Sequence, residues 1–162
     1  MEEVTLPDGS TIERGHIEHP GSVVIVPLQG TEVLMLSQYR RSLGQTILEL
    51  PAGTREWGEE WLLCAQRELR EETGFQADQF VDLGRVWPAP GVTDELMAVY
   101  LALGLSYAPL PADFDEQIEV RPMALADLVK MALDGRLWDA KSVVAILRTA
   151  AYLGDSPLKE SS

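Results

Sequence analysis

The stretch GTREWGEEWLLCAQRELREETGF, residues 53–75, gathers many acidic side chains in one short segment that also has the pattern of a helix. Residues three and four apart share a face of a helix, and Glu68, Glu71 and Glu72 have that spacing. Two carboxylates about 4 Å apart repel by ~4 kcal/mol at an effective dielectric of about 20. A hard divalent cation such as Mg²⁺ would offset this repulsion, because it takes oxygen ligands. The alternative is a solvated face on which arginines of the same helix pair with the glutamates, and helical spacing alone favours that alternative.

The same stretch predicts where the helix lies and which face it buries. We expect a helix over residues 59–73, ended by Gly74, which suits a left-handed C-cap. Leu62, Ala65 and Leu69 fall together on the face away from the glutamates. We expect that apolar face to pack against a sheet.

Length, charge and cysteine content limit the classes of protein. The 162 residues fit one domain, 1–162, with its own core. Thirteen Lys and Arg against 26 Asp and Glu give a net charge of −13, which argues against nucleic acid or an anionic membrane as a partner. Cys64 is the only cysteine, so no internal disulfide can form and a cytoplasmic location is expected. We expect neither a signal peptide nor a membrane span, because no apolar run is long enough.

The rest of the chain indicates an α+β domain. A hairpin is expected in residues 2–14, turning at Asp8–Gly9. Strands are expected at residues 22–28, 33–39, 46–51, 80–87, 96–105 and 118–123. Further helices are expected at residues 125–133 and 140–153, the second capped by Asp139 and followed by Gly154. Strands first, one inserted helix and helices last are typical of a layered α+β fold.

The charged stretch also matches a known motif, the Nudix box, Gly-x5-Glu-x7-Arg-Glu-apolar-x-Glu-Glu-x-Gly-apolar. The matching positions are Gly53, Glu59, Arg67, Glu68, Leu69, Glu71, Glu72, Gly74 and Phe75. A motif with so many fixed positions is specific. The chain therefore resembles the Nudix hydrolases. The resemblance implies an α/β/α sandwich with a mixed sheet and a loop-helix-loop metal site.

The resemblance also implies roles for residues of the box. The family hydrolyses nucleoside diphosphates linked to another group. Glu68, Glu71, Glu72 and the carbonyl of Ala52 would be ligands of two or more Mg²⁺ ions, for which Mn²⁺ could substitute. Glu59 and Arg67, by contrast, would form a structural salt bridge between the loop and the helix.

Sequence outside the box resembles the ADP-ribose pyrophosphatases within that family. The similar segments are EHPGSVVIVPL, VLMLSQYRRSLGQTILELPAGT and PAPGVTDE. Pro90 stands sixteen residues after Gly74, where this subfamily keeps a proline. The implied reaction is Mg²⁺-dependent hydrolysis of ADP-ribose, or of a related ADP-sugar, to AMP and ribose 5-phosphate.

The subfamily resemblance assigns further residues to the substrate. Arg40 would contact the pyrophosphate, while Gly91 and Glu95 would line the side of the terminal ribose. The loop PADFDEQIEV would deliver a late acidic residue to the metals. Glu116 fits that position better than Asp115, although both could be plain loop carboxylates. Glu116 would then be catalytic together with Glu68 and Glu72.

Two features depart from the subfamily pattern. Trp57 stands where many relatives have proline. Trp57 and Trp87 could stack on a base, but a buried or half-buried core position is favoured for Trp87. The N-terminal region is shorter than in relatives, in which it often crosses to a partner subunit. The resemblance implies a homodimer with residues 1–18 at the interface.

Two alternatives to ADP-ribose hydrolysis remain open. The substrate could be another diphosphate compound, such as FAD, GDP-mannose or a dinucleoside polyphosphate. The chain could also be a Nudix-fold sensor that binds ADP-ribose without cleaving it. An intact box favours an enzyme over a sensor.

Overall fold

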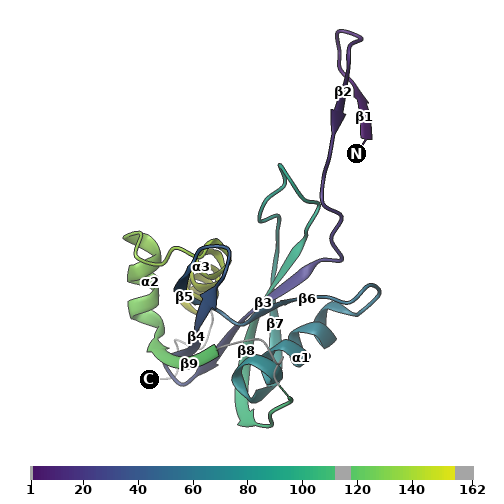
Figure 1. The fold of residues 1–162 in the computed structure, drawn as a ribbon. Helices are drawn as coiled ribbons and strands as arrows, with labels where there is room; N and C mark the ends of the chain where they lie inside the picture. The colour runs from purple at the N-terminus through teal and green to yellow at the C-terminus, as the bar shows by residue number, and fades with distance from the viewer. Residues whose placement is uncertain (1, 112–117, 156–162) are drawn as a thin grey trace.

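The computed structural model describes residues 2–111 and 118–155, which form a mixed sheet between helices (Figure 1). In these residues seven strands make the main sheet, in the order β5-β4-β3-β8-β7, with β6 paired to β3 and β9 paired to β4. The strands are β3 (Ser22–Gln29), β4 (Glu32–Arg40), β5 (Gln45–Glu49), β6 (Ala52–Thr54), β7 (Phe75–Val86), β8 (Met97–Tyr107) and β9 (Ile118–Ala124).

Strand β3 lies at the centre of the sheet. It pairs in parallel with β8 and antiparallel with β6 and β4. Its residues 23–26 are fully buried although they point alternately to both faces of the sheet. A strand covered on both faces requires such a continuous apolar run. The α+β layered prediction is therefore confirmed.

Helix α1 (Trp61–Thr73) covers one face of the sheet. Cys64, Ala65 and Leu69 are buried and form a cluster with residues of β3 and β8. Leu62 was expected on this face, but the structure contradicts that expectation, because the residue is 43% exposed. Trp61, one position earlier, packs against the cluster instead.

Helices α2 (Leu125–Leu133) and α3 (Ala140–Asp155) cover the other face. Leu128 of α2 and Ile146 of α3 are buried against the second apolar cluster, which includes Val24 and Val26 of β3. The side chains of β3 thus alternate between two cores. None of the helices in the described residues has the length and apolar character of a membrane span.

Most predicted elements match the structure, with three corrections. Strand β7 begins at Phe75 rather than at residue 80, because the polar run that follows Phe75 pairs with β8 even though its side chains carry little strand signal. Strand β6 was not predicted, since only its pairing with β3 makes it a strand. Helix α3 continues through Gly154 to Asp155. Asp139 does cap α3, since its carboxylate accepts the N–H of Ser142.

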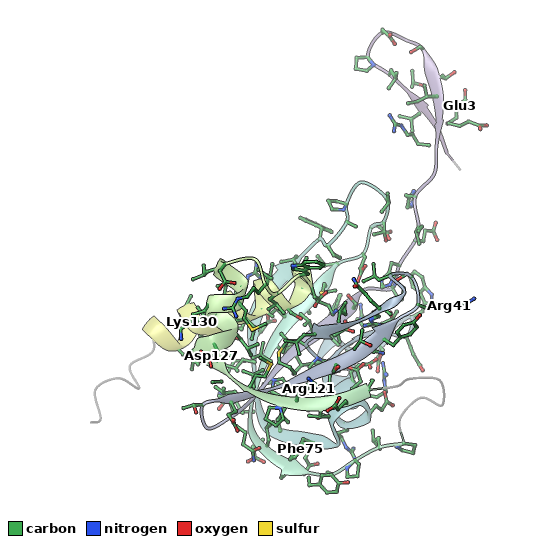
Figure 2. The ribbon with its side chains drawn as sticks, turned by 60° about the vertical axis from the view of Figure 1, so that its left-hand side comes forward. Glu3, Arg41, Phe75, Arg121, Asp127 and Lys130 are labelled. Atoms are coloured by element: carbon green, nitrogen blue, oxygen red, sulfur yellow. The ribbon has the colours of Figure 1, made fainter. Side chains whose placement is uncertain are left out.

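The N-terminal hairpin forms as predicted from β1 (Glu2–Thr5) and β2 (Thr11–Arg14). Its turn is held by Asp8, whose carboxylate accepts the N–H of Ser10 at 3.0 Å. The two strands form a separate sheet and project from the body of the molecule in both views (Figures 1 and 2). An isolated two-stranded hairpin has little stability of its own in water.

Gly21 controls the contact between α1 and the start of β3. Its φ is +98°, and a Cβ there would lie 2.5 Å from a ring carbon of Trp61. We expect Gly21→Ala to lower the free energy of unfolding by about 2–4 kcal/mol, from backbone strain and from overpacking. Chemical denaturation would measure the change.

Gly30→Ala is the matched control for this substitution. Gly30 also has a positive φ, +61°, but a Cβ there would meet no atom within 4 Å. It should cost only the backbone strain, about 1–2 kcal/mol. Equal losses for the two variants would show that the contact with Trp61 is unimportant.

Candidate active site

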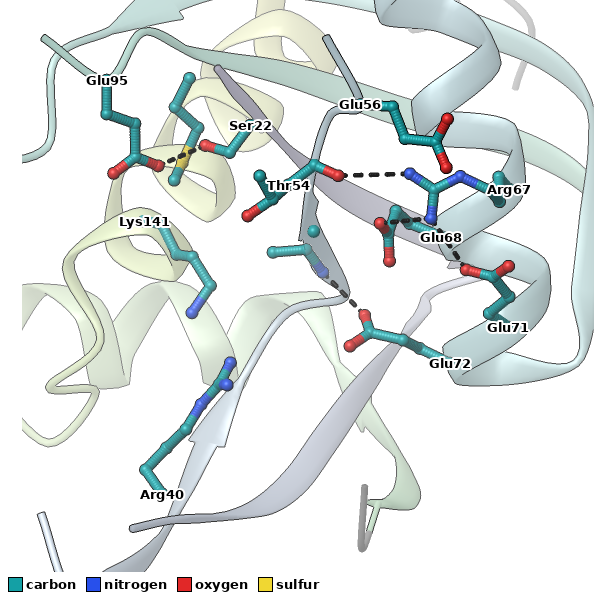
Figure 3. A pocket seen from close by; sticks show the side chains of 13 residues that line it. Ser22, Arg40, Thr54, Glu56, Arg67, Glu68, Glu71, Glu72, Glu95 and Lys141 are labelled. Carbon is teal, nitrogen blue, oxygen red and sulfur yellow. Dashed lines mark hydrogen bonds and ion pairs between the residues drawn. The ribbon is translucent and has the colours of Figure 1, made fainter. Parts of the chain in front are cut away.

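A cleft of about 600 Å³ opens beside α1 and gathers most of the predicted site residues (Figure 3). They come from distant parts of the sequence: β4, β6, α1 and the loop before β8. The predicted residues that line the cleft are Arg40, Ala52, Glu68, Glu71, Glu72 and Glu95. Gly91 is absent from this lining, and Glu116 lies outside the described residues.

Three glutamates of α1, Glu68, Glu71 and Glu72, form what we call the carboxylate wall of the cleft. Glu68 is 9% and Glu72 is 8% exposed, so both are nearly buried although they line the cleft. Glu72 Oε2 accepts the backbone N–H of Ala52 at 2.8 Å. This bond ties α1 to strand β6.

Arg67 links the carboxylate wall to the loop between β6 and α1. Its guanidinium donates to Glu59 at 3.0 Å, to Glu68 at 2.7 Å and to Glu71 at 3.0 Å. The predicted salt bridge between Glu59 and Arg67 is therefore confirmed. The hydrogen bond from Arg67 lowers the pKa of Glu59, against the opposing effect of burial. The same bond raises the pKa of Arg67, so the guanidinium stays charged.

Gly53 explains why the motif begins with glycine. A Cβ at this position would lie 1.9 Å from the carboxyl carbon of Glu68. The backbone at Gly53 thus approaches the carboxylate more closely than any other residue type would allow. Because Gly53 has no Cβ, the Glu68 carboxylate can occupy its position beside this backbone in the lining of the cleft.

The carbonyl of Ala52 faces away from β3. The bonds Ile25 N–H to Pro51 O and Arg55 N–H to Gly21 O flank the pairing of β6 with β3. In an antiparallel pair this pattern makes Ala52 and its partner Val24 a non-hydrogen-bonded pair. The N–H and the carbonyl of Ala52 therefore both point away from β3, toward the side on which Glu72 accepts the Ala52 N–H.

These groups suit a hard divalent cation in their chemistry. They are carboxylate and carbonyl oxygens, the ligands that Mg²⁺ prefers. Within the described ranges, however, no three acidic, His or Cys side chains converge as a ready-made cation site. Arg67 instead holds Glu68 and Glu71. The residues present fit the cation by donor type, with Glu72 and the Ala52 carbonyl on the same side of β6.

A second charged group lies across the cleft from the carboxylate wall. Arg40 donates from Nε and Nη2 to the two oxygens of Glu49, at 2.8 Å each. Lys141 of α3 donates to Glu49 Oε2 at 2.5 Å and pairs with Asp139 at 2.9 Å. We call Arg40 and Lys141 the cationic wall (Figure 3).

Sequence reasoning found Arg40 but missed Glu49 and Lys141. Glu49 stands between Leu48 and Leu50 in a short apolar run, and a charged residue there signals a buried and paired group. Lys141 gave no comparable signal, because its partner Glu49 is 92 positions away.

The remaining predicted substrate residues lie on two sides of the loop before β8. Glu95 Oε1 accepts the hydroxyl of Ser22 at 2.5 Å within the cleft. Gly91 lines a separate hollow of about 430 Å³ with His16 and Trp87. Trp87 was expected at a buried or half-buried core position, but that expectation is wrong, because the residue is 66% exposed.

Two further groups near α1 have structural roles. Burial raises the pKa of the Cys64 thiol to about 12, so this cysteine stays protonated and unreactive. Arg55, which sequence reasoning missed, lies 3.9 Å above the ring of Trp61 and donates to the carbonyl of Pro20 at 2.9 Å. Arg55 thereby fastens the loop between β6 and α1 to the start of β3.

Comparison with known proteins settles the family. The family model described as NUDIX domain matches residues 18–145. The chain belongs to the Nudix family. The matched residues of this Nudix chain include both the carboxylate wall and the cationic wall of the cleft.

Individual Nudix relatives cover most of the chain. An ADP-ribose pyrophosphatase of Bacillus subtilis (strain 168) is 36% identical over 90% of this chain and 80% of its own length. A methanol dehydrogenase activator of Bacillus methanolicus is 35% identical over the same shares of the two chains. A solved structure of an ADP compounds hydrolase has a TM-score of 0.81 over 94% of this chain and 83% of its own. That structure is only 24% identical and shows the shared fold alone.

Proposed function

We propose that this Nudix enzyme hydrolyses the pyrophosphate bond of ADP-ribose, or of a related ADP-sugar, to AMP and ribose 5-phosphate. The observation that carries the proposal is one cleft with a carboxylate wall facing a cationic wall. Such a cleft suits an anionic diphosphate that binds together with divalent cations. The 36% identity to an ADP-ribose pyrophosphatase over most of both chains supports this substrate.

Nudix hydrolases generally use divalent metals such as Mg²⁺. Here Glu68, Glu71, Glu72 and the carbonyl of Ala52 would hold two or more Mg²⁺ ions, with Mn²⁺ as an alternative. Such ions neutralise the charge of the diphosphate and acidify a bound water. The cytoplasm, where Mg²⁺ and nucleotides are available and a lone buried cysteine stays reduced, is the proposed location.

The chain's own groups would bind the substrate and move the proton. Arg40 donates to non-bridging oxygens of the diphosphate, as its planar guanidinium suits. Glu95, beside Ser22, accepts a hydroxyl of the terminal ribose. Glu116 accepts the proton of the attacking water, while Glu68 and Glu72 keep their charge at the carboxylate wall.

The test is a hydrolysis assay on a panel of compounds with Mg²⁺ and with a chelator. ADP-ribose should give AMP and ribose 5-phosphate, with a higher kcat/KM than FAD, GDP-mannose or a dinucleoside polyphosphate. Preference for one of these other compounds would replace ADP-ribose as the substrate. Binding of ADP-ribose without any turnover would identify a sensor and overturn the proposed enzyme.

The proposal includes a homodimer with residues 1–18 at its interface. The strands β1 and β2 project from the body and pair only with each other among the described strands. At the root of the hairpin, Ile17, Val92 and Trp87 expose large apolar side chains. A marginal hairpin above an exposed apolar patch gains stability if a second subunit covers both.

Removal of residues 1–14 tests the dimer. We expect the full chain to sediment as a dimer at micromolar concentration and the truncated chain to shift toward the monomer. The body should stay folded, because it contains both apolar clusters. A full-length chain that is monomeric and active at that concentration would contradict the proposed assembly.

A further inference from the structure

We infer that Lys141 is a second diphosphate-binding cation of the cleft, and that the buried carboxylate of Glu49 positions it together with Arg40. The inference rests on the proposed function for the identity of the whole substrate. The diphosphate group itself can be tested separately with inorganic pyrophosphate.

Glu49 joins the two cations into one unit. Its side chain is 1% exposed, so its charge is almost wholly removed from water. Oε1 receives Arg40 Nε, and Oε2 receives both Arg40 Nη2 and Lys141 Nζ. The negative charge of Glu49 offsets the repulsion between the two cations that it binds. The unit therefore keeps two positive groups side by side at the cleft.

The position of Lys141 disfavours a cation unless anionic groups lie beside it. It lies in the first turn of α3, where the helix dipole disfavours a cation. Its side chain is only 14% exposed, and burial disfavours a charged ammonium. Glu49 and Asp139 are the partners that the structure gives it. An ammonium has three hydrogens, so these two partners leave one for a ligand oxygen.

The distribution of charge in the cleft points to the same assignment. The cations that line the described part of the cleft are Arg40, Arg67 and Lys141. Arg67 is bound to three glutamates of the box side. Arg40 and Lys141 together meet two carboxylates, Glu49 and Asp139, so the cationic wall is less negative than the surroundings of Arg67 and is the better place for anionic oxygens of a ligand (Figure 3).

The first experiment compares Lys141→Met with Lys130→Met. Methionine keeps the length of the lysine stem and removes its charge. Lys130 is an exposed lysine of α2 that pairs with Asp127 (Figure 2) and is not among the residues that line the cleft. With Mg²⁺ held constant, calorimetry should show about tenfold weaker binding of inorganic pyrophosphate to Lys141→Met, the typical effect of one charged hydrogen bond. Lys130→Met should bind like the wild type.

Steady-state kinetics on ADP-ribose should also distinguish Lys141→Met from Lys130→Met. Lys141→Met should raise KM about tenfold with kcat nearly unchanged, since the contact exists before and during the reaction. Lys141→Arg, which keeps the charge, should restore most of the pyrophosphate affinity. Binding of pyrophosphate by folded Lys141→Met within twofold of the wild type would overturn the inference. So would a wild-type protein that binds no pyrophosphate.

A second measurement needs no variant and decides the matter if Lys141→Met fails to fold. The chain has three lysines, Lys130, Lys141 and Lys159. An amine-acylating reagent followed by peptide mass spectrometry reports the reaction rate of each. Saturating pyrophosphate with Mg²⁺ should slow acylation of Lys141 severalfold and leave Lys130 unchanged. An unchanged rate at Lys141 would contradict the inference.

These outcomes separate the inference from the proposed function. If the wild type does not cleave ADP-ribose but pyrophosphate protects Lys141, the proposed function fails and the cationic unit stands. If ADP-ribose is cleaved and Lys141→Met matches the wild type in both KM and pyrophosphate binding, only the role of Lys141 fails.

Discussion

Glu72→Gln is expected to lower kcat on ADP-ribose by about 10³-fold or more, equivalent to ~4 kcal/mol of barrier. Glu72 is nearly buried at the carboxylate wall, and its carboxylate lies on the side of β6 toward which the Ala52 carbonyl points. Removing its charge weakens the attraction for a divalent cation, while the side chain keeps its size. Calorimetric titration with Mg²⁺ should show weaker binding in the same variant.

The fold should survive this change. A glutamine at position 72 still offers an oxygen to the N–H of Ala52, and the loss of one charge relieves repulsion from Glu68 and Glu71. The free energy of unfolding should therefore hold or rise slightly. Glu72→Ala should instead lose about 1–3 kcal/mol, because it leaves the N–H of Ala52 without its acceptor.

Glu32→Gln is a control for the activity measurement. Glu32 is exposed at the start of β4, the end of that strand opposite to Arg40. The same chemical change there should leave kcat within about twofold, as for most surface substitutions. Wild-type kcat for Glu72→Gln at saturating Mg²⁺ would refute the assignment of Glu72.

The sequence predicts the carboxylate wall well, and the reason is local. Helical spacing places Glu68, Glu71 and Glu72 on one side of α1, and fixed spacing to Glu59 and Arg67 gives their salt bridge. The central strands were also predictable, since a run such as residues 22–28 has to be buried on both faces. Local patterns thus specify an element together with the side chains that it presents.

The cationic wall could not be predicted in the same way. Glu49 and Lys141 meet through packing of α3 on the sheet, with no pattern near either residue to indicate the other. The predicted burial of single aromatic and aliphatic residues at the ends of elements was also wrong, because it too depends on tertiary packing. Trp87 follows the last residue of β7, and Leu62 is the second residue of α1. Their exposure depends on where neighbouring loops run, which residue type alone does not determine.

The structure also sharpens the search for the general base. Glu72 is engaged by Ala52, and Glu68 and Glu71 are engaged by Arg67. A carboxylate that holds Mg²⁺ is a poor base as well, because the cation stabilises its charged form. Glu95 and Glu56 are the other carboxylates that line the described part of the cleft, and Glu95 is bound by Ser22. Glu56 therefore becomes a competitor of Glu116, which the sequence favours.

Glu116→Gln is expected to lower kcat on ADP-ribose by about 10²–10⁴-fold, the range for losing general acid–base assistance. KM should change little, because the proton moves in the transition state rather than in the bound ground state. Mg²⁺ binding should also change less than in Glu72→Gln, since a base need not hold the cation. The measurements are steady-state kinetics and metal titration on Glu116→Gln, Asp115→Asn and Glu56→Gln in parallel.

The three variants lead to different conclusions. If Asp115→Asn is the impaired variant, the base lies one residue earlier in the same loop. If Glu56→Gln is impaired instead, the proton is taken by the loop between β6 and α1, beside the carboxylate wall. If none loses more than about tenfold, a change worth only ~1.4 kcal/mol, no single one of these carboxylates is the base. A glutamate of the carboxylate wall would then have to leave its present partner during the reaction, as Glu68 and Glu71 would leave Arg67.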